Sequence, residues 1–97
     1  MKTITCLVID PLGFHARPVS MMAKKAKECE DAFGTTIMIT YGETTVKAKS
    51  IMKVMSLGVR CNDTVIFKVD GGDENATIET FKPILIDWFP LKVLQEQ

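Results

Sequence analysis

The only histidine of this chain, His15, lies in the stretch Gly13-Phe14-His15-Ala16-Arg17-Pro18. A neutral imidazole has a free ring nitrogen that is a nucleophile near neutral pH. Arg17 follows two residues later and carries a permanent positive charge on a forked hydrogen-bond donor. If the ring attacks a phosphoryl group, the product carries close to two negative charges, which a neighbouring guanidinium would stabilise. These residue types at this spacing therefore favour a phosphohistidine site.

An amphipathic helix is predicted to begin directly after His15. Apolar or small residues recur at helical spacing, and the helix is expected to run from about Ala16 or Pro18 to Asp31. The first turn of a helix leaves backbone N–H groups without partners, and the helix dipole places partial positive charge at the same end. We therefore expect the amides of Ala16 and Arg17 to donate hydrogen bonds to an anion held at His15.

Other chemistries fit this stretch less well. A single histidine beside an arginine is a poor cation site, so we expect no metal there. The sequence implies no nucleotide or prosthetic group, so we expect no other cofactor. A hydrolytic triad is disfavoured, because the sequence has no second histidine and no G-x-S-x-G turn. The alternative that His15 only caps the helix is disfavoured by the glycine before it and by the arginine and proline after it.

Four strands are predicted from stretches of β-branched and alternating apolar residues: 3–9, 35–41, 44–48 and 64–70. With three helices between and after them, the element order is βαββαβα. This order predicts an α+β fold, an open-faced sandwich in which helices cover one face of a four-stranded antiparallel sheet. We expect one domain over residues 1–90, followed by a mobile tail at 91–97.

The second and third helices are each preceded by a residue type that favours helix N-caps. Ser50 is predicted to cap a short helix over 50–56, and Asp73 to cap a helix that starts at residue 74. Pro83 should kink or interrupt the third helix, whose apolar stripe continues through Trp88 and Phe89 up to Pro90.

The short second helix carries more apolar side chains than can face one core. Its spacing puts Ile51 and Met55 on one face, with Met52 at the edge. Exposed methionines can adapt to more than one partner surface. We interpret these residues as a docking patch, and the alternative is that all of them are core.

Composition bounds the class of protein. Lysine plus arginine equals aspartate plus glutamate, at 12 each, so there is no overall attraction to nucleic acid. Cys6, Cys29 and Cys61 are an odd number without metal-type spacing, and are expected to be reduced thiols. The sequence shows no signal-peptide pattern and no stretch that could span a membrane. We therefore expect a cytoplasmic protein without membrane insertion.

Two stretches resemble the HPr family, the histidine-containing phosphocarriers of the phosphoenolpyruvate:sugar phosphotransferase system. The first is Gly13–Pro18, and the second is residues 48–58, AKSIMKVMSLG. The resemblance covers about residues 1–82 and implies the open-faced sandwich described above. It implies that Nδ1 of His15 accepts a phosphoryl group from Enzyme I and passes it to a IIA domain of a sugar transporter. Arg17 would stabilise the transferred charge, and the chain would be a carrier rather than a stand-alone enzyme.

The resemblance also implies docking and regulatory residues. In family members from low-GC Gram-positive bacteria, the serine that matches Ser50 is phosphorylated by an ATP-dependent kinase, so an HPr serine kinase/phosphatase is a further expected partner. The docking surface would comprise residues from the first and second helices: Met21, Lys24, Lys27, Ile51, Met52, Lys53 and Met55.

Some residues depart from the family pattern. Leu12 stands where many members carry a small polar residue, Val19 replaces a commoner alanine, and Pro83 does not match the usual third helix. Two further hypotheses stay open: a phosphocarrier of a regulatory, nitrogen-linked branch, and a noncatalytic binding domain that kept the fold. In each case we expect a monomer.

Overall fold

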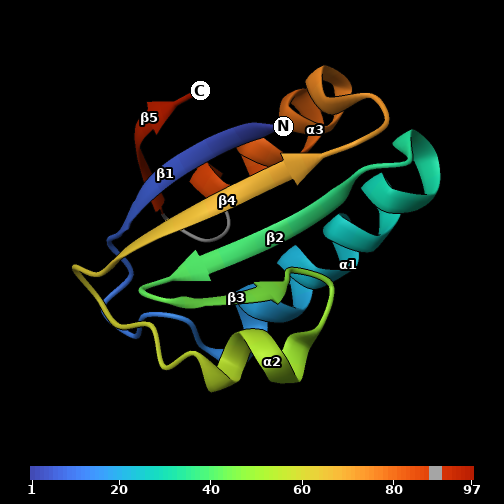
Figure 1. Cartoon of the computed structure of the whole chain (residues 1–97). Coiled ribbons are helices and arrows are strands. Elements are labelled where there is room, and N and C mark those ends of the chain that lie inside the picture. The colour runs from blue at the N-terminus through green and yellow to red at the C-terminus, as the bar shows by residue number, and fades with distance from the viewer. Residues whose placement is uncertain (88–90) are drawn as a thin grey trace.

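An antiparallel sheet forms from the stretches rich in β-branched residues. The computed structural model describes residues 1–87 and 91–97. Within these residues the sheet has five strands, in the order β3-β2-β4-β1-β5 (Figure 1). The strands are β1 (Lys2–Val8), β2 (Thr36–Tyr41), β3 (Thr44–Lys47), β4 (Thr64–Asp70) and β5 (Leu91–Glu96). The predicted α+β class is confirmed, with one strand more than expected.

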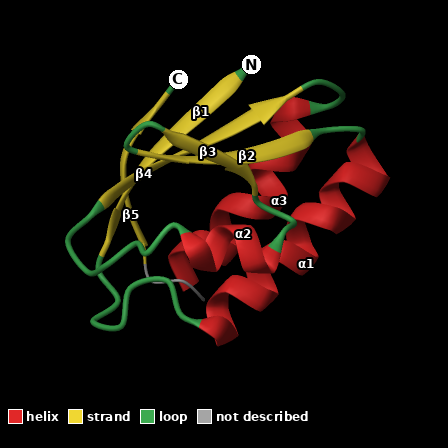
Figure 2. Cartoon of the chain, turned by 60° about the horizontal axis from the view of Figure 1, so that its bottom comes forward, coloured by secondary structure: helices red, strands yellow, loops and turns green. Residues whose placement is uncertain are grey.

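The helices of the described chain all lie on one face of this sheet, as Figure 2 shows. They are α1 (Ala16–Phe33), α2 (Ile51–Ser56) and α3 (Glu74–Asp87). Helix α1 ends at Gly34, which adopts a left-handed φ of 71° and donates its N–H to the Glu30 carbonyl at 3.0 Å. The predicted cap of α3 is confirmed, because the Asp73 carboxylate accepts the Ala76 N–H at 3.0 Å.

The predicted Ser50 cap was wrong, because Ser50 precedes α2 but its hydroxyl makes no capping hydrogen bond. Pro83 does not interrupt α3, which continues through it, because a proline removes only one backbone donor while Phe81 and Leu85 anchor the helix in the core. The predicted stripe at Trp88 and Phe89, and the stop at Pro90, lie outside the described residues.

The core fills the space between the sheet and the helices. On β4 the alternate residues Val65, Phe67 and Val69 are fully buried, as strand periodicity predicts. The Phe67 ring meets the Phe81 ring of α3 edge to face, with centroids 5.9 Å apart. Each such buried side chain contributes roughly 1.5–3 kcal/mol to the free energy of unfolding. The core therefore holds α1 and α3 against the sheet.

The three cysteines are free thiols in the structure. Cys6 and Cys29 are buried, and Cys61 is half-buried. Burial is the main cause that raises the pKa of the Cys6 thiol to about 12, so its thiolate is not populated near neutral pH. Cys6 and Cys29 therefore act as small apolar core residues.

Residues 91–97, expected to form a tail, instead add β5 to the edge of the sheet. Leu91 pairs with Val8, and Val93 with Cys6. Because Leu91 is only 3% exposed, burying it favours the strand, which also satisfies backbone groups on the edge of β1. The expected domain boundary at residue 90 lies outside the described residues.

We predict that β5 contributes to stability through Leu91. Leu91→Ala should lower the free energy of unfolding by about 2–4 kcal/mol, because it leaves a cavity in the core. Leu94 on the same strand is 50% exposed, so Leu94→Ala should change it by less than about 0.5 kcal/mol. Urea denaturation of both variants measures the difference. Equal losses would show that β5 is not packed as the structure has it.

Candidate functional site

His15 occupies the N-cap position of α1. Its backbone is extended, with φ −112° and ψ 169°, and its carbonyl accepts the Val19 N–H at 3.2 Å. The first three residues of a helix have no helical acceptor for their amides, and Pro18, the third of them, has no N–H. Ala16 and Arg17 therefore carry the two amides available at this helix mouth. This is the local arrangement that the sequence predicted around His15.

The loop before His15 packs directly on the loop that precedes β4. The Phe14 N–H donates to the Val59 carbonyl at 3.1 Å. Gly13 has φ +64°, and a Cβ placed on it would lie 2.4 Å from the Val59 carbonyl oxygen. Only glycine combines this left-handed conformation with so close an approach. The contact fixes where the chain enters α1 and so where His15 lies.

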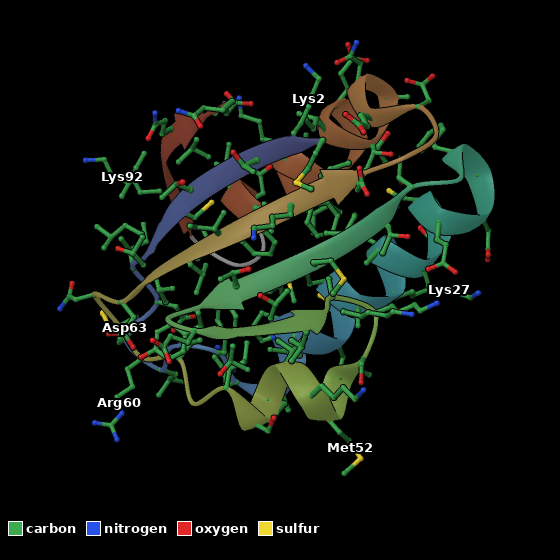
Figure 3. The ribbon with its side chains drawn as sticks, in the orientation of Figure 1. Lys2, Lys27, Met52, Arg60, Asp63 and Lys92 are labelled. Carbon is green, nitrogen blue, oxygen red and sulfur yellow. The ribbon has the colours of Figure 1, made fainter. Side chains whose placement is uncertain are left out.

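Asp63 holds the loop that precedes β4 in place. The Asp63 carboxylate accepts the Tyr41 hydroxyl at 2.6 Å and the Arg60 N–H at 2.9 Å. The hydrogen bond from Tyr41, and then the one from Arg60, lower the pKa of Asp63. The hydrogen bond between Tyr41 and Asp63 also raises the pKa of Tyr41. Arg60 and Asp63 lie together at this end of the molecule in Figure 3. These hydrogen bonds therefore fix the backbone against which Gly13 packs.

Asp10 contacts the imidazole, which the sequence reasoning missed. The Oδ2 atom of Asp10 lies 3.0 Å from Nε2 of His15, and its Oδ1 accepts the Leu12 N–H at 2.9 Å. The Leu12 bond, followed by the His15 bond, lowers the pKa of the Asp10 carboxyl. Aspartate side chains commonly accept a hydrogen bond from the backbone N–H two residues later and so form a turn. Asp10 before Pro11 was therefore a usable sequence signal for a turn that holds this carboxylate in place.

A small cavity of about 160 Å³ opens beside the imidazole. Its lining residues are Asp10, His15, Arg17, Pro18 and Met21. Arg17 is exposed, and in the part of the chain that the structure describes no carboxylate lies within 4.0 Å of its guanidinium. The cavity thus combines a nucleophilic ring with a cation that is free to bind an anion.

The predicted docking residues of α2 are exposed. Ile51 is 42%, Met52 84% and Met55 37% exposed, whereas Val54 is fully buried. Figure 3 shows the Met52 side chain pointing away from α2. Lys53 is exposed on the same helix. Helix α2 therefore presents an exposed apolar surface that carries one positive charge, from Lys53.

The predicted docking residues of α1 fall into two groups. Met21 lines the cavity beside His15, and with Lys24 it lines a second hollow of about 260 Å³. Lys27 lies further along the helix and pairs with Asp31 at 3.2 Å and with Glu30 at 3.9 Å. The structure therefore brings Met21 to the imidazole, while the charge of Lys27 is partly neutralised.

Ser50 lies directly before α2 and follows Lys49, whose ion pair connects this segment to α1. The Lys49 ammonium lies 2.8 Å from a carboxylate oxygen of Glu30. Ser50 itself is half-buried, and its N–H donates to the Lys47 carbonyl at 3.1 Å. This places Ser50 next to Ile51 and Met52 at the edge of the exposed apolar surface.

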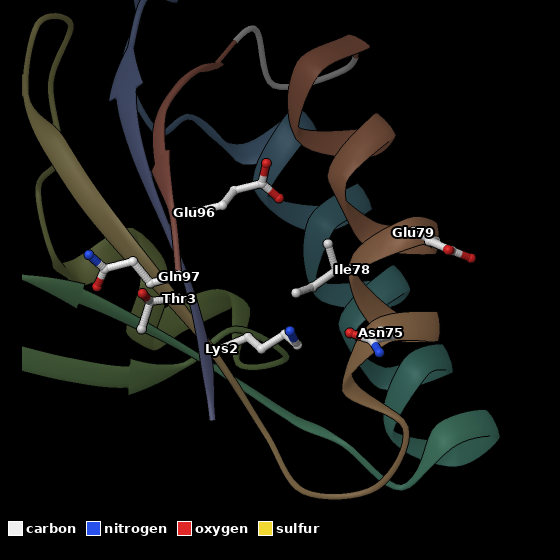
Figure 4. Close-up of a pocket in the computed structure, with 7 residues that line it drawn as sticks. All are labelled: Lys2, Thr3, Asn75, Ile78, Glu79, Glu96 and Gln97. Atoms are coloured by element: carbon white, nitrogen blue, oxygen red, sulfur yellow. The ribbon is translucent and has the colours of Figure 1, made fainter.

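A larger cavity, of about 490 Å³, lies away from the imidazole, between α3 and the strands β1 and β5 (Figure 4). Lys2 and Ile78 point into it, and none of the predicted site residues lines it. Among residues 1–87 and 91–97, no group of three or more His, Cys, Asp or Glu side chains could hold a metal ion. No helix in the same residues is long and apolar enough to cross a membrane.

Comparison with known proteins gives consistent matches over most of the chain. A family model described as the PTS HPr component phosphorylation site matches residues 2–86. The chain is 34% identical to a phosphocarrier protein HPr of Mycoplasma genitalium, over 88% of this chain and 93% of that protein. It is 36% identical to one of Lysinibacillus sphaericus, over 90% and 94% of the two chains.

Solved structures agree with these sequence matches. A histidine-containing phosphocarrier protein of Mycoplasma superposes with a TM-score of 0.79 at 32% identity, over 88% of this chain and 92% of that one. The HPr of Thermoanaerobacter tengcongensis superposes with the same TM-score at 31% identity, over 93% and 97% of the two chains.

We predict that Gly13 is required for the packing of the two loops. Gly13→Ala should lower the free energy of unfolding by at least about 2 kcal/mol more than Gly42→Ala, because it adds a backbone clash. Gly42 has a similar φ of +61° with nothing within 4 Å of an added Cβ, so its substitution costs only the left-handed conformation, about 1 kcal/mol. Equal losses in chemical denaturation would contradict the close approach.

Proposed function

This chain belongs to the HPr family of phosphocarriers of the phosphotransferase system, and we propose that His15 carries its phosphoryl group. The observation that supports this most directly is the arrangement of the helix mouth. The imidazole lies at the N-terminus of α1 beside the amides of Ala16 and Arg17, and shares a cavity with the guanidinium of Arg17. A nucleophile beside three cationic or partly positive donors suits a group that brings negative charge.

We propose that Enzyme I, charged from phosphoenolpyruvate, supplies the phosphoryl group. The lone pair of Nδ1 of His15 attacks phosphorus, and the bond from phosphorus to Enzyme I breaks. The charge on the phosphoryl oxygens falls beside Arg17 and the first-turn amides, which need little rearrangement to stabilise it. A IIA domain of a sugar transporter then accepts the phosphoryl group. Its own nucleophile attacks phosphorus, and the bond between phosphorus and Nδ1 of His15 breaks. This chain supplies position and charge, and both partners meet it in the cytoplasm.

The docking surface for these partners would extend from the cavity across α1 and α2. Its apolar part is the exposed surface of α2, and an acidic partner would complement the lysines around it. Burying exposed apolar side chains at the centre of an interface supplies affinity. The proposed members are Met21, Lys24, Lys27, Ile51, Met52, Lys53 and Met55.

We further propose that Ser50 is a regulatory phosphorylation site for an HPr serine kinase/phosphatase. A phosphate on Ser50 would place nearly two negative charges beside Ile51 and Met52, which a partner must desolvate. The nearest lysine in sequence, Lys49, is already paired with Glu30 at 2.8 Å. A phosphate would therefore weaken docking, and would repel an acidic partner.

We predict that His15 is the only residue to gain a phosphoryl group from Enzyme I and phosphoenolpyruvate. Intact mass should show one acid-labile phosphoryl group on the unmodified chain and none on His15→Ala. Arg17→Ala should still be labelled, but about 10- to 1000-fold more slowly and with unchanged melting, because it removes one charge-stabilising donor. Labelling of His15→Ala, or full-rate labelling of Arg17→Ala with reduced stability, would contradict the proposal.

We predict that a negative charge on α2 weakens docking without unfolding the chain. Met52→Asp and Ser50→Asp should each raise the KM for Enzyme I at least about tenfold, because an apolar contact or a nearby acid must then be desolvated. Leu94→Asp is the matched control, since Leu94 is also exposed but lies on β5, at the opposite edge of the sheet from β3. An unchanged KM for the α2 variants, or an equal rise for the control, would place docking elsewhere.

A further inference from the structure

The carboxylate of Asp10 is held in place by its own turn. Its Oδ1 accepts the Leu12 N–H at 2.9 Å, and its backbone carbonyl accepts the Gly13 N–H at 2.9 Å. Its side chain is only 14% exposed, against 34% for His15. The remaining oxygen, Oδ2, lies 3.0 Å from Nε2 of His15. The carboxylate therefore reaches the imidazole from a fixed position.

This contact determines which ring nitrogen carries the proton. The hydrogen bonds from Leu12 and His15 lower the pKa of Asp10, so the carboxyl group is ionised near neutral pH. An ionised carboxylate can accept hydrogen bonds but cannot donate one. Nε2 of His15 must then be the donor, and in the neutral ring Nδ1 holds the free lone pair.

We propose that Asp10 is a positioning residue for phosphoryl transfer, which holds His15 in the tautomer whose nucleophile is Nδ1 and stabilises the ring when that atom is phosphorylated. This inference rests on the function proposed above. It assigns to Asp10 a role in the chemistry of His15 that a merely structural turn would not have.

The transfer then needs no proton movement in this chain. The Nδ1 lone pair forms the new N–P bond as the bond between phosphorus and the donor breaks. The electron pair of the broken bond stays with the donor. The proton stays on Nε2, so the phosphorylated ring carries a positive charge. Asp10 faces that charge across 3.0 Å, which stabilises the product as a charge-assisted hydrogen bond.

The charged groups around the cavity have separate effects. Asp10 lies on the Nε2 side of the ring and attracts the ring, although its own charge opposes an approaching phosphoryl group. Arg17 lines the same cavity and offsets that repulsion, together with the amide of Ala16. The carboxylate of Asp10 can therefore lie beside an anion site, because its hydrogen bond directs it to the Nε2 side of the ring.

The test compares Asp10→Asn with the unmodified chain. Asparagine can keep the Leu12 bond, but its side chain can either donate to Nε2 or accept from it, so it does not select a tautomer. Nitrogen-15 shifts of the labelled imidazole, measured with the ring neutral, should show mainly the Nε2–H form in the unmodified chain. In Asp10→Asn the tautomer ratio should fall roughly tenfold, and phosphorylation by Enzyme I should slow by a similar factor with unchanged KM.

The matched control is Asp70→Asn. Asp70 lies at the far end of β4 and is 63% exposed, so the variant removes the same charge without contacting the imidazole. It should alter neither the tautomer ratio nor the rate. An unchanged tautomer ratio in Asp10→Asn, or a slower rate without a change in the ratio, overturns the proposal. If the unmodified chain accepts no phosphoryl group, the proposed function fails and the rate comparison with it, whereas the tautomer ratio still tests the Asp10 contact.

Discussion

The position of His15 depends on the close packing of two loops at one end of the sheet. Strand β1 ends at Val8 and β4 begins at Thr64, and the two strands are antiparallel neighbours. The loop that leaves β1 and the loop that enters β4 must therefore meet at this end. Gly13 lets them meet so closely that the Phe14 N–H reaches the Val59 carbonyl. The place of His15 at the start of α1 follows from that contact.

Stability and chemistry are divided between the two sides of the helical layer. A six-residue helix such as α2 is not stable alone, so it forms because Val54 is buried in the core. The residues on its other side, above all Met52, are then free to meet a partner. In the same way α1 is held by its buried face, while its first turn keeps two amides and Arg17 open. The residues proposed for function therefore lie where packing makes few demands.

Much of this arrangement could be predicted because it depends on local patterns. Strand alternation and helix periodicity located the main elements, and Pro18 with the helix after it placed His15 at a helix mouth. Strand β5 could not be predicted, because its pairing with β1 is a contact between the two ends of the chain. The Asp10–His15 contact depends on the geometry of one turn. The expected Ser50 cap failed, because residue type favours such a bond without determining the side-chain conformation.

The central claim is that His15 at the mouth of α1 is the phosphoryl acceptor, through Nδ1. A phosphorus–nitrogen correlation spectrum of the chain, labelled with nitrogen-15 in its single histidine and phosphorylated by Enzyme I, tests it most directly. The structure predicts one phosphorus signal, coupled to Nδ1, with the proton retained on Nε2 beside Asp10. A phosphorus signal coupled to Nε2, or one without coupling to histidine, would contradict the account.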